Sequence, residues 1–287
     1  MAKGDSRKVV VAALLANLGI AIVKGIAAVA TRSGAMLAET VHSLADSGNQ
    51  ALLLLGAARA KRPPDRRHPF GYGSERYFWA FIVALVLFSL GALFSFYEGI
   101  EKVLHPTPIR NPAWAYGVLG VSLVLELISF RVAHREVQVE LRGRSFKRYF
   151  LETKDPSLPL VYLEDLGALL GLVFALAGVG ASHLLGLRLA DGIATLLIGA
   201  LLGAIAVVLL ARCHRLLIGE GASDEDLERI HAAVDGLGEI VDLKTLQLGP
   251  DNLIVALEVR LKGSVAEVES AVRRAVPHAT HVAIEPA

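Results

Sequence analysis

The sequence predicts a mainly helical membrane protein, with six helices that span the bilayer as a bundle and a small α+β module at the C-terminal end. Two observations predict the bundle. The mean hydropathy is +0.52 and 54% of the 287 residues are hydrophobic, which is too apolar for an ordinary soluble domain. The apolar stretches also reach about 20 residues, the length at which a helix crosses a bilayer. A third observation, the change in composition after about residue 216, predicts the module.

The six expected spans differ in the charge of the loops that join them. They cover residues 9–30, 35–58, 78–104, 112–133, 158–185 and 189–211. The loops after the second and fourth spans carry six Lys and Arg residues each, whereas the loops after the third and fifth carry one each. Because basic residues favour the cytoplasmic side, we expect both termini in the cytoplasm. No small-residue cleavage site precedes the first span, so no removable signal peptide is expected.

The C-terminal module is expected to be a domain of its own, residues 213–287, beside a membrane domain of residues 1–212. Ser223 and the acidic residues after it are typical of a helix N-terminus. The expected order is helix, strand, strand, helix, strand (αββαβ), at residues 224–236, 240–248, 253–261, 265–276 and 281–284. A module of about 70 residues is marginal alone, which favours a homodimer.

The second span carries ionisable residues in the middle of an apolar run. His42 and Asp46 are four residues apart, so they share one face of a helix. Glu39 lies near that face and Asn49 extends it. Each ionisable group at bilayer depth costs about 2.5–3.5 kcal/mol, so a chain that gathers several is expected to use them. A histidine and a carboxylate on one face of a helix supply two of the four ligands of a tetrahedral divalent-metal site.

The fifth span offers the other half of such a site. Glu164 and Asp165 are adjacent carboxylates in an apolar run, and they point about 100° apart on a helix. Together with His42 and Asp46 they would suit Zn²⁺, and a more oxygen-rich set would favour a harder ion such as Mn²⁺. Two alternatives stay open. The acidic pair could cap the span at the membrane interface, and the second-span pair could form a hydrogen bond between helices.

The loop after the second span is a further candidate, since Asp65 and His68 could bind a metal there. The alternative is a basic turn that faces lipid headgroups. Three histidines of the module are expected to be ordinary surface residues: His231, His278 and His281. Three charged residues in or near the spans are expected to form structural ion pairs: Lys24, Glu126 and Arg131.

These residues stand in a pattern that resembles the cation diffusion facilitator family over nearly the whole chain. The resemblance rests on the run from Ser33 to Glu39 before His42 and Asp46, on the loop from Arg62 to Gly73, and on Tyr97 to Ile100 at the end of the third span. It implies a homodimer that exports divalent metals, mostly Zn²⁺, from the cytosol in exchange for protons. It also implies that the αββαβ module is similar to small metallochaperones.

The resemblance implies ligands as well. His42, Asp46 and Asp165 match three of the four transport-site ligands of the family. The fourth, a histidine one turn before the aspartate, is Val161 here, and Glu164 lies beside the aspartate instead. Together with Asn49 and Gln50 after the second-span motif, this departure makes the chain resemble the branch that includes the animal mitochondrial-type zinc transporters. In the loop, two ligands are matched, by Asp65 and His68, and Tyr72 stands where a histidine is common.

The expected function is therefore export of a divalent cation, first of all Zn²⁺, by proton antiport and alternating access. Metal binding needs neutral histidine and ionised carboxylates, so it releases protons, and an unperturbed histidine titrates at about pH 6.5. Mn²⁺, Fe²⁺, Co²⁺ and Cd²⁺ are alternative cargoes, and a non-transporting partner subunit is the alternative role. An enzyme is not expected, because the chain has neither a His-Glu-x-x-His nor a Gly-x-Ser-x-Gly motif.

The expected surroundings follow from the same features. The chain is expected to be an integral membrane protein of a bacterial inner membrane, because it is compact and has neither a His-rich loop nor a transit peptide. Its expected partners are the metal ion, protons, the lipid bilayer and a second copy of the chain. No nucleic-acid partner is expected.

Overall fold

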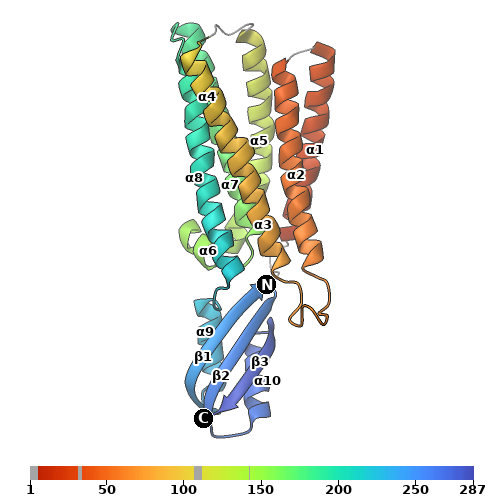
Figure 1. Ribbon diagram of the computed structural model, residues 1–287, viewed down its shortest axis with the longest axis vertical. Helices are drawn as coiled ribbons and strands as arrows, with labels where there is room; N and C mark the ends of the chain where they lie inside the picture. The colour runs from red at the N-terminus through yellow and green to blue at the C-terminus, as the bar shows by residue number, and fades with distance from the viewer. Residues whose placement is uncertain (1–5, 32–33, 107–111, 142) are drawn as a thin grey trace. The chain divides into compact units, whose positions relative to one another are not determined.

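The computed structural model describes residues 6–31, 34–106, 112–141 and 143–287 (Figure 1). The helices are α1 (Ser6–Thr31), α2 (Gly34–Arg59), α3 (Glu75–Val86), the π-helical segment η1 (Leu87–Leu93), α4 (Phe94–Leu104), α5 (Pro112–Leu141), α6 (Phe146–Glu152), α7 (Ser157–Leu184), α8 (Ala190–Ile218), α9 (Asp224–Val234) and α10 (Val265–Ala275). The strands are β1 (Gly238–Gly249), β2 (Asn252–Leu261) and β3 (Ala279–Pro286). In α2, the side chains before Ser43 lie outside the described part.

Four helical stretches of the described chain are long and apolar enough to cross a membrane. They are Glu75–Leu104, Ala115–Leu141, Ser157–Leu184 and Ala190–Ile218. The prediction of a mainly helical membrane protein with a small C-terminal sheet is thereby confirmed. The expected third, fourth and sixth spans are parts of longer helices, because polar turns extend each apolar core at one end. The short helix α6 lies where the sequence pattern predicted only a loop.

The third span departs from the continuous α-helix that its apolar run predicts. The segment η1, whose wider turns join residue i to i+5, separates α3 from α4. Beyond it, Lys102 of α4 lies 3.1 Å from a carboxylate oxygen of Asp191 in α8. The two helices approach closely at Gly99, which has no side chain. A Cβ added there would lie only 2.8 Å from the side chain of Leu196. The half of the span that follows η1 therefore packs against α8.

The C-terminal module is a three-stranded sheet with two helices that pack against each other on one face. Strand β2 is central, antiparallel to β1 and parallel to β3. Alternate residues of β2 are buried, from Leu253 to Val259, and α9 and α10 cover them. Both helices begin at a serine that caps backbone N–H groups, Ser223 for α9 and Ser264 for α10. The elements occur in the order α9, β1, β2, α10, β3.

The chain forms two compact units. One comprises Met1–Leu55, Trp79–Ser145 and Ser157–Ala211, and the other comprises Gly56–Phe78, Phe146–Pro156 and Arg212–Ala287. The second unit therefore joins the module to two loop segments that come much earlier in the chain. Each unit has its own polar contacts, which are described in turn below.

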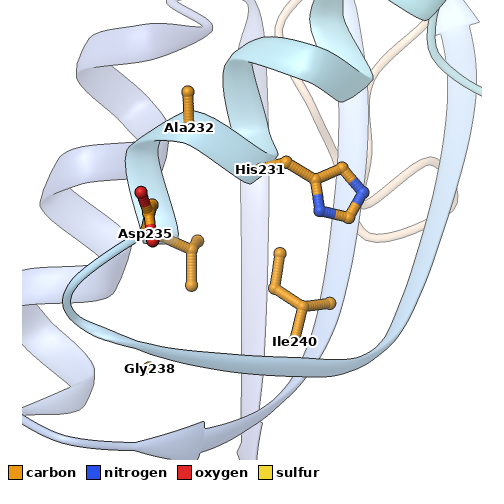
Figure 2. A pocket seen from close by; sticks show the side chains of 6 residues that line it. His231, Ala232, Asp235, Gly238 and Ile240 are labelled. Carbon is orange, nitrogen blue, oxygen red and sulfur yellow. The ribbon is translucent and has the colours of Figure 1, made fainter.

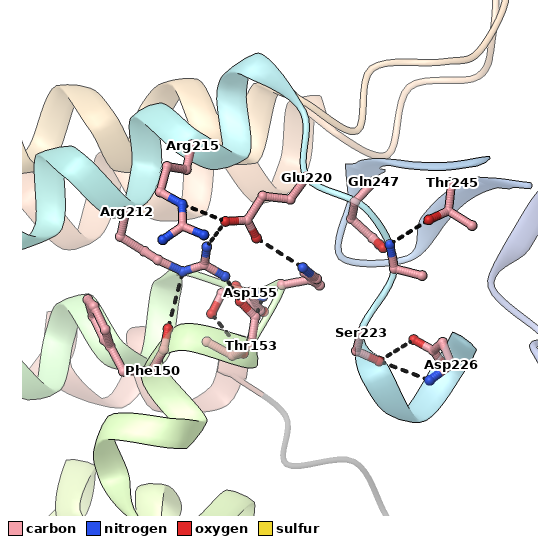
Figure 3. A network of polar contacts seen from close by, with 12 residues as sticks. Phe150, Thr153, Asp155, Arg212, Arg215, Glu220, Ser223, Asp226, Thr245 and Gln247 are labelled. Carbon is pink, nitrogen blue, oxygen red and sulfur yellow. Dashed lines mark hydrogen bonds and ion pairs between the residues drawn. The ribbon is translucent and has the colours of Figure 1, made fainter. Parts of the chain in front are cut away.

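Within the second unit, a buried arginine organises the polypeptide before the module (Figure 3). The guanidinium of Arg212 donates to the backbone carbonyl oxygens of Phe150 at 3.1 Å and Thr153 at 2.6 Å, and to Glu220 at 2.5 Å. The Glu220 carboxylate also lies 2.9 Å from the ammonium of Lys154. Burial disfavours the charged form of Glu220, but Arg212 and Lys154 outweigh it, so the pKa of Glu220 is lowered.

The loop before α3 docks on the turn between β1 and β2 in the same unit. The hydroxyl of Ser74 donates to the carbonyl oxygen of Leu248 at 3.0 Å, and the Asn252 amide donates to the carbonyl oxygen of Phe70 at 2.7 Å. At Gly73 a Cβ would lie 2.7 Å from the Leu248 oxygen, so the two backbones meet at a distance that only glycine permits. The loop is thus held by direct contact with the module.

Candidate metal site in the membrane helices

The acidic residues predicted on the second and fifth spans come together in the first unit. Glu164 and Asp165 of α7 are buried, with 5% and 3% of their surface exposed. Asp46 of α2 is partly buried and lies close enough to interact electrostatically with both of them. Helix α7 begins at Ser157, so the pair lies well beyond the first turn, where a capping carboxylate acts. The geometry therefore disfavours the capping alternative.

Each carboxylate of α7 is held by a donor from a different helix. The amide of Asn49 in α2 donates to Oε1 of Glu164 at 2.6 Å, and the hydroxyl of Ser129 in α5 donates to Oδ2 of Asp165 at 3.0 Å. The second oxygen of Glu164, Oε2, is buried and has no hydrogen-bond partner in the described part of the chain. A buried carboxylate oxygen without a donor is costly, and a cation would compensate it.

Helix α5 adds a fourth carboxylate. Glu126 has 5% of its surface exposed and interacts electrostatically with Glu164 and with Asp165. The sequence pattern predicted an ion pair of Glu126 with Lys24 or Arg131, and that pairing stays a prediction. The Lys24 side chain lies outside the described part of the chain. The signal that could have identified the role of Glu126 is its spacing, since it stands one helical turn before Ser129 in an otherwise apolar run.

The four carboxylates lie in one region of the bundle but do not form a complete metal-coordination shell among the described residues. Among the described residues, no three His, Cys, Asp or Glu side chains gather tightly enough to hold one ion. The predicted ligand His42 lies outside that set, because its side chain is among those not described. Oxygen donors from α2, α5 and α7 suit a divalent cation, and they would have to close around it.

The predicted loop site is organised around the carboxylate of Asp65. Its Oδ1 accepts the backbone N–H groups of Arg67 at 2.8 Å and His68 at 2.7 Å, and its Oδ2 accepts the hydroxyl of Tyr72 at 2.6 Å. The Tyr72 and His68 hydrogen bonds lower the pKa of Asp65. The His68 ring lies against that of Tyr72, with centroids 4.3 Å apart. Metal binding at Asp65 and His68 stays a prediction, and the observed role of Asp65 is to shape the loop.

The histidines of the module occupy ordinary positions. His231 lines an open pocket beside Ile240, with Asp235 on its opposite side (Figure 2). His278 lies 3.2 Å from the carboxylate of Asp226. Burial disfavours the charged form of Asp226, but hydrogen bonds from His278 and Ser223 outweigh it and lower the pKa of Asp226. The ring of His281 meets that of Phe70 edge-on, with centroids 4.9 Å apart.

Comparison with known proteins decides the family. A family profile described as "Cation efflux transmembrane domain" matches residues 10–218. The chain belongs to the cation efflux family. This confirms the resemblance to cation diffusion facilitators. The matched region contains the four apolar helical stretches found in the described part of the chain, and it contains Asp46, Glu126, Glu164 and Asp165.

Relatives within the cation efflux family match most of the chain. It is 37% identical over 268 residues to the proton-coupled zinc antiporter SLC30A9, mitochondrial, of Xenopus laevis, which covers 92% of this chain and 48% of that protein. The human protein of the same name is 34% identical over 268 residues, with 92% and 47% covered. Metal tolerance protein C4 of Arabidopsis thaliana is 32% identical over 241 residues, with 81% and 52% covered. The chain thus spans about half the length of these cation efflux relatives.

The relatives also bear on the expected location. An integral membrane protein is supported by the family and by the four apolar helices of the described part. The expectation of a bacterial inner membrane is not supported, because the two vertebrate relatives are named as mitochondrial. The compact chain and its lack of a His-rich loop were too general a signal to specify the membrane.

Proposed function

We propose that this chain carries Zn²⁺ across a membrane in exchange for protons. The observation that carries the proposal is the meeting of Asp46 from α2, Glu126 from α5, and Glu164 and Asp165 from α7 inside an apolar bundle. The names of the vertebrate relatives support zinc as the cargo and protons as the counter-ion. His42, four residues before Asp46, would add the nitrogen ligand that zinc favours.

Exchange follows from the chemistry of the ligands. Carboxylates crowded at bilayer depth repel one another when all are ionised, so either protons or a divalent cation must balance them. A metal ion binds the ionised form and displaces protons, and protons displace the metal in turn. If the site opens to one side of the membrane at a time, each cycle of metal and proton binding moves metal in one direction across the membrane and protons in the other. The hydrogen bonds from Asn49 and Ser129 would orient the carboxylates in either state.

The wider assembly belongs to the same proposal. Six membrane spans, with α1 and α2 as the first two, place both termini on one side of the membrane, and the basic loops favour the cytoplasmic side. Two copies of the chain, with a module on each, form the transporting unit. Residues 1–212 are the transport domain and residues 213–287 the accessory domain of each copy.

The test is transport in proteoliposomes that contain the purified full-length chain. A zinc indicator and a pH indicator inside the vesicles report both fluxes after external Zn²⁺ is added. We expect zinc entry to be coupled to proton exit, and we expect Asp46→Asn and Asp165→Asn each to abolish both fluxes. The matched control is Glu101→Gln, since that carboxylate stands at the end of α4 with 59% of its side chain exposed. Zinc transport without proton movement, or full activity in both aspartate variants, would contradict the proposal.

A harder cation is the second candidate cargo. The described donors are carboxylate oxygens, and an oxygen-rich site shifts preference toward Mn²⁺. The same vesicles distinguish the cargoes, because Mn²⁺, Fe²⁺, Co²⁺ and Cd²⁺ can each be offered in competition with Zn²⁺. A chain that binds zinc through Asp46 but moves none of these ions would be the non-transporting partner subunit.

A further inference from the structure

A histidine of α5 lies between the carboxylates and the carboxyl end of that helix. His134 follows Ser129, the donor to Asp165, by five residues, which is about 7.5 Å along a helix axis. The two helices α5 and α7 pack side by side, and His134 is partly buried at the edge of their interface. Its ring centroid lies 6.0 Å from that of Tyr162 in α7 and 5.7 Å from that of Phe130.

The two ring nitrogens of His134 meet different surroundings. Nε2 lies 3.4 Å from the side-chain amide nitrogen of Gln138, an exposed residue one turn further along α5. Nδ1 is buried and has no hydrogen-bond partner among the described residues. A polar atom buried without a partner is unfavourable and is uncommon unless it has a role. One nitrogen therefore reaches the exposed surface while the other points into the protein.

We propose that His134 relays protons between the buried carboxylates and the solution at the carboxyl end of α5. The inference rests on the proposed function, since it supplies a path for the exchanged protons. The amide nitrogen of Gln138 donates to Nε2, so the resting ring carries its proton on Nδ1. When metal leaves and the carboxylates are reloaded, Nε2 takes a proton from solvent, Nδ1 gives its proton through water to Asp165 or its neighbours, and the neutral ring returns to its first tautomer by exchange with water. When metal displaces a proton from the carboxylates, the same steps run in reverse.

A relay fits the surroundings of His134 better than a metal ligand does. One imidazole nitrogen is too few donors for zinc, and no cluster of metal-binding side chains includes it in the described part of the chain. The titratable group that faces it from α7 is Tyr162, and the α5 neighbour Gln138 does not titrate. Helix α1 also packs against α5, and its described side chains carry no titratable group. Histidine is the side chain that exchanges protons readily near neutral pH.

The test uses the full-length protein in proteoliposomes and separates proton delivery from zinc binding. In His134→Gln we expect the maximal zinc flux and the coupled proton flux to fall together by about tenfold or more. The KM for zinc and the equilibrium affinity for zinc should stay unchanged, because the carboxylates are untouched. In His134→Ala, added imidazole should restore most of the lost flux by replacing the missing ring. The matched control is His105→Gln, since His105 follows α4 with 71% of its side chain exposed, and it should behave as wild type.

Each remaining outcome overturns the relay. An unchanged maximal flux in His134→Gln shows that protons leave by another path. A loss of zinc affinity shows that His134 binds metal. A slow His134→Ala variant that imidazole does not restore shows that the side chain acts through packing. Failure of the proposed function is distinguishable from failure of the relay, because the wild-type chain itself would then show no zinc flux or no proton flux.

Discussion

Replacing Glu220 by Gln removes the carboxylate that balances a buried guanidinium. The Arg212 side chain is only 3% exposed, and its other acceptors are two neutral carbonyl oxygens. Breaking a buried ion pair from one side costs about 3–5 kcal/mol, because a charge is left uncompensated. Glu220 is 14% exposed and therefore partly hydrated, which favours the lower end of that range. Since Lys154 and Arg215 also pair with it, their mutual repulsion adds to the loss. We expect Glu220→Gln to destabilise the second unit by about 3 kcal/mol.

Backbone hydrogen exchange of the full chain in detergent micelles measures this loss. The N–H of Gln247 in β1 donates to the backbone oxygen of Glu220 at 2.8 Å, so it reports on the affected region. A loss of about 3 kcal/mol corresponds to exchange faster by about a hundredfold. The matched control is Glu225→Gln in α9, whose partner Arg229 is exposed, and it should change the free energy by less than about 0.5 kcal/mol. Equal effects in the two variants would refute the role assigned to the buried pair.

Three single substitutions test the site, the docked loop and the module separately. Asn49→Leu removes the donor to Glu164, so zinc affinity measured by titration calorimetry should fall about 10–100-fold. Gly73→Ala puts a Cβ 2.7 Å from the carbonyl oxygen of Leu248, so exchange of the loop amides should reveal a destabilisation of about 1–3 kcal/mol. Because the pKa of Asp226 is lowered in the folded module, its charge stabilises the fold above its ordinary pKa of 3.8. The advantage of wild type over Asp226→Asn in thermal unfolding should be full at neutral pH and vanish as the pH falls below that value.

Two of these three substitutions have a matched control. Asn17→Leu removes another buried amide, which bonds to Gln50 at 3.3 Å, and it should leave zinc affinity unchanged. Gly120→Ala adds a methyl group where no described atom lies within 4 Å, so it should be tolerated. A zinc affinity that falls equally in both amide variants, or a Gly73→Ala variant that exchanges like Gly120→Ala, would count against the assigned contacts. A pH-independent difference between wild type and Asp226→Asn would show that the carboxylate stabilises by shape and not by charge.

Local spacing in the sequence predicted those parts of the site that lie on single helices. The four-residue interval between His42 and Asp46, and the acidic pair at Glu164 and Asp165, are visible because charges in an apolar run are costly. Helical periodicity likewise predicted the membrane helices and the sheet-containing module, since both patterns repeat over many residues.

Tertiary contacts account for what the sequence pattern did not predict. Glu126 and Ser129 join the site only because α5 packs against α7, and no spacing in the chain states which helices are neighbours. The hydrogen bonds that Asp65 accepts from the hydroxyl of Tyr72 and from two backbone N–H groups depend on how the loop folds, and its role as a metal ligand stays a prediction. The docking of the loop at Gly73 on the module depends on shape, which composition does not reveal.

The π-helical segment η1 determines which way α4, the second half of the third span, faces. Successive residues of an α-helix turn by about 100°, and the wider π turns advance less per residue, so letting Leu87–Leu93 relax to α-helix with every residue kept would swing everything beyond it by about that angle. Gly99 and Lys102 would then rotate away from α8, and the contact with Asp191 would be lost without any change to those side chains. The winding of this segment is therefore as much a determinant of the helix interface as the residues that form it.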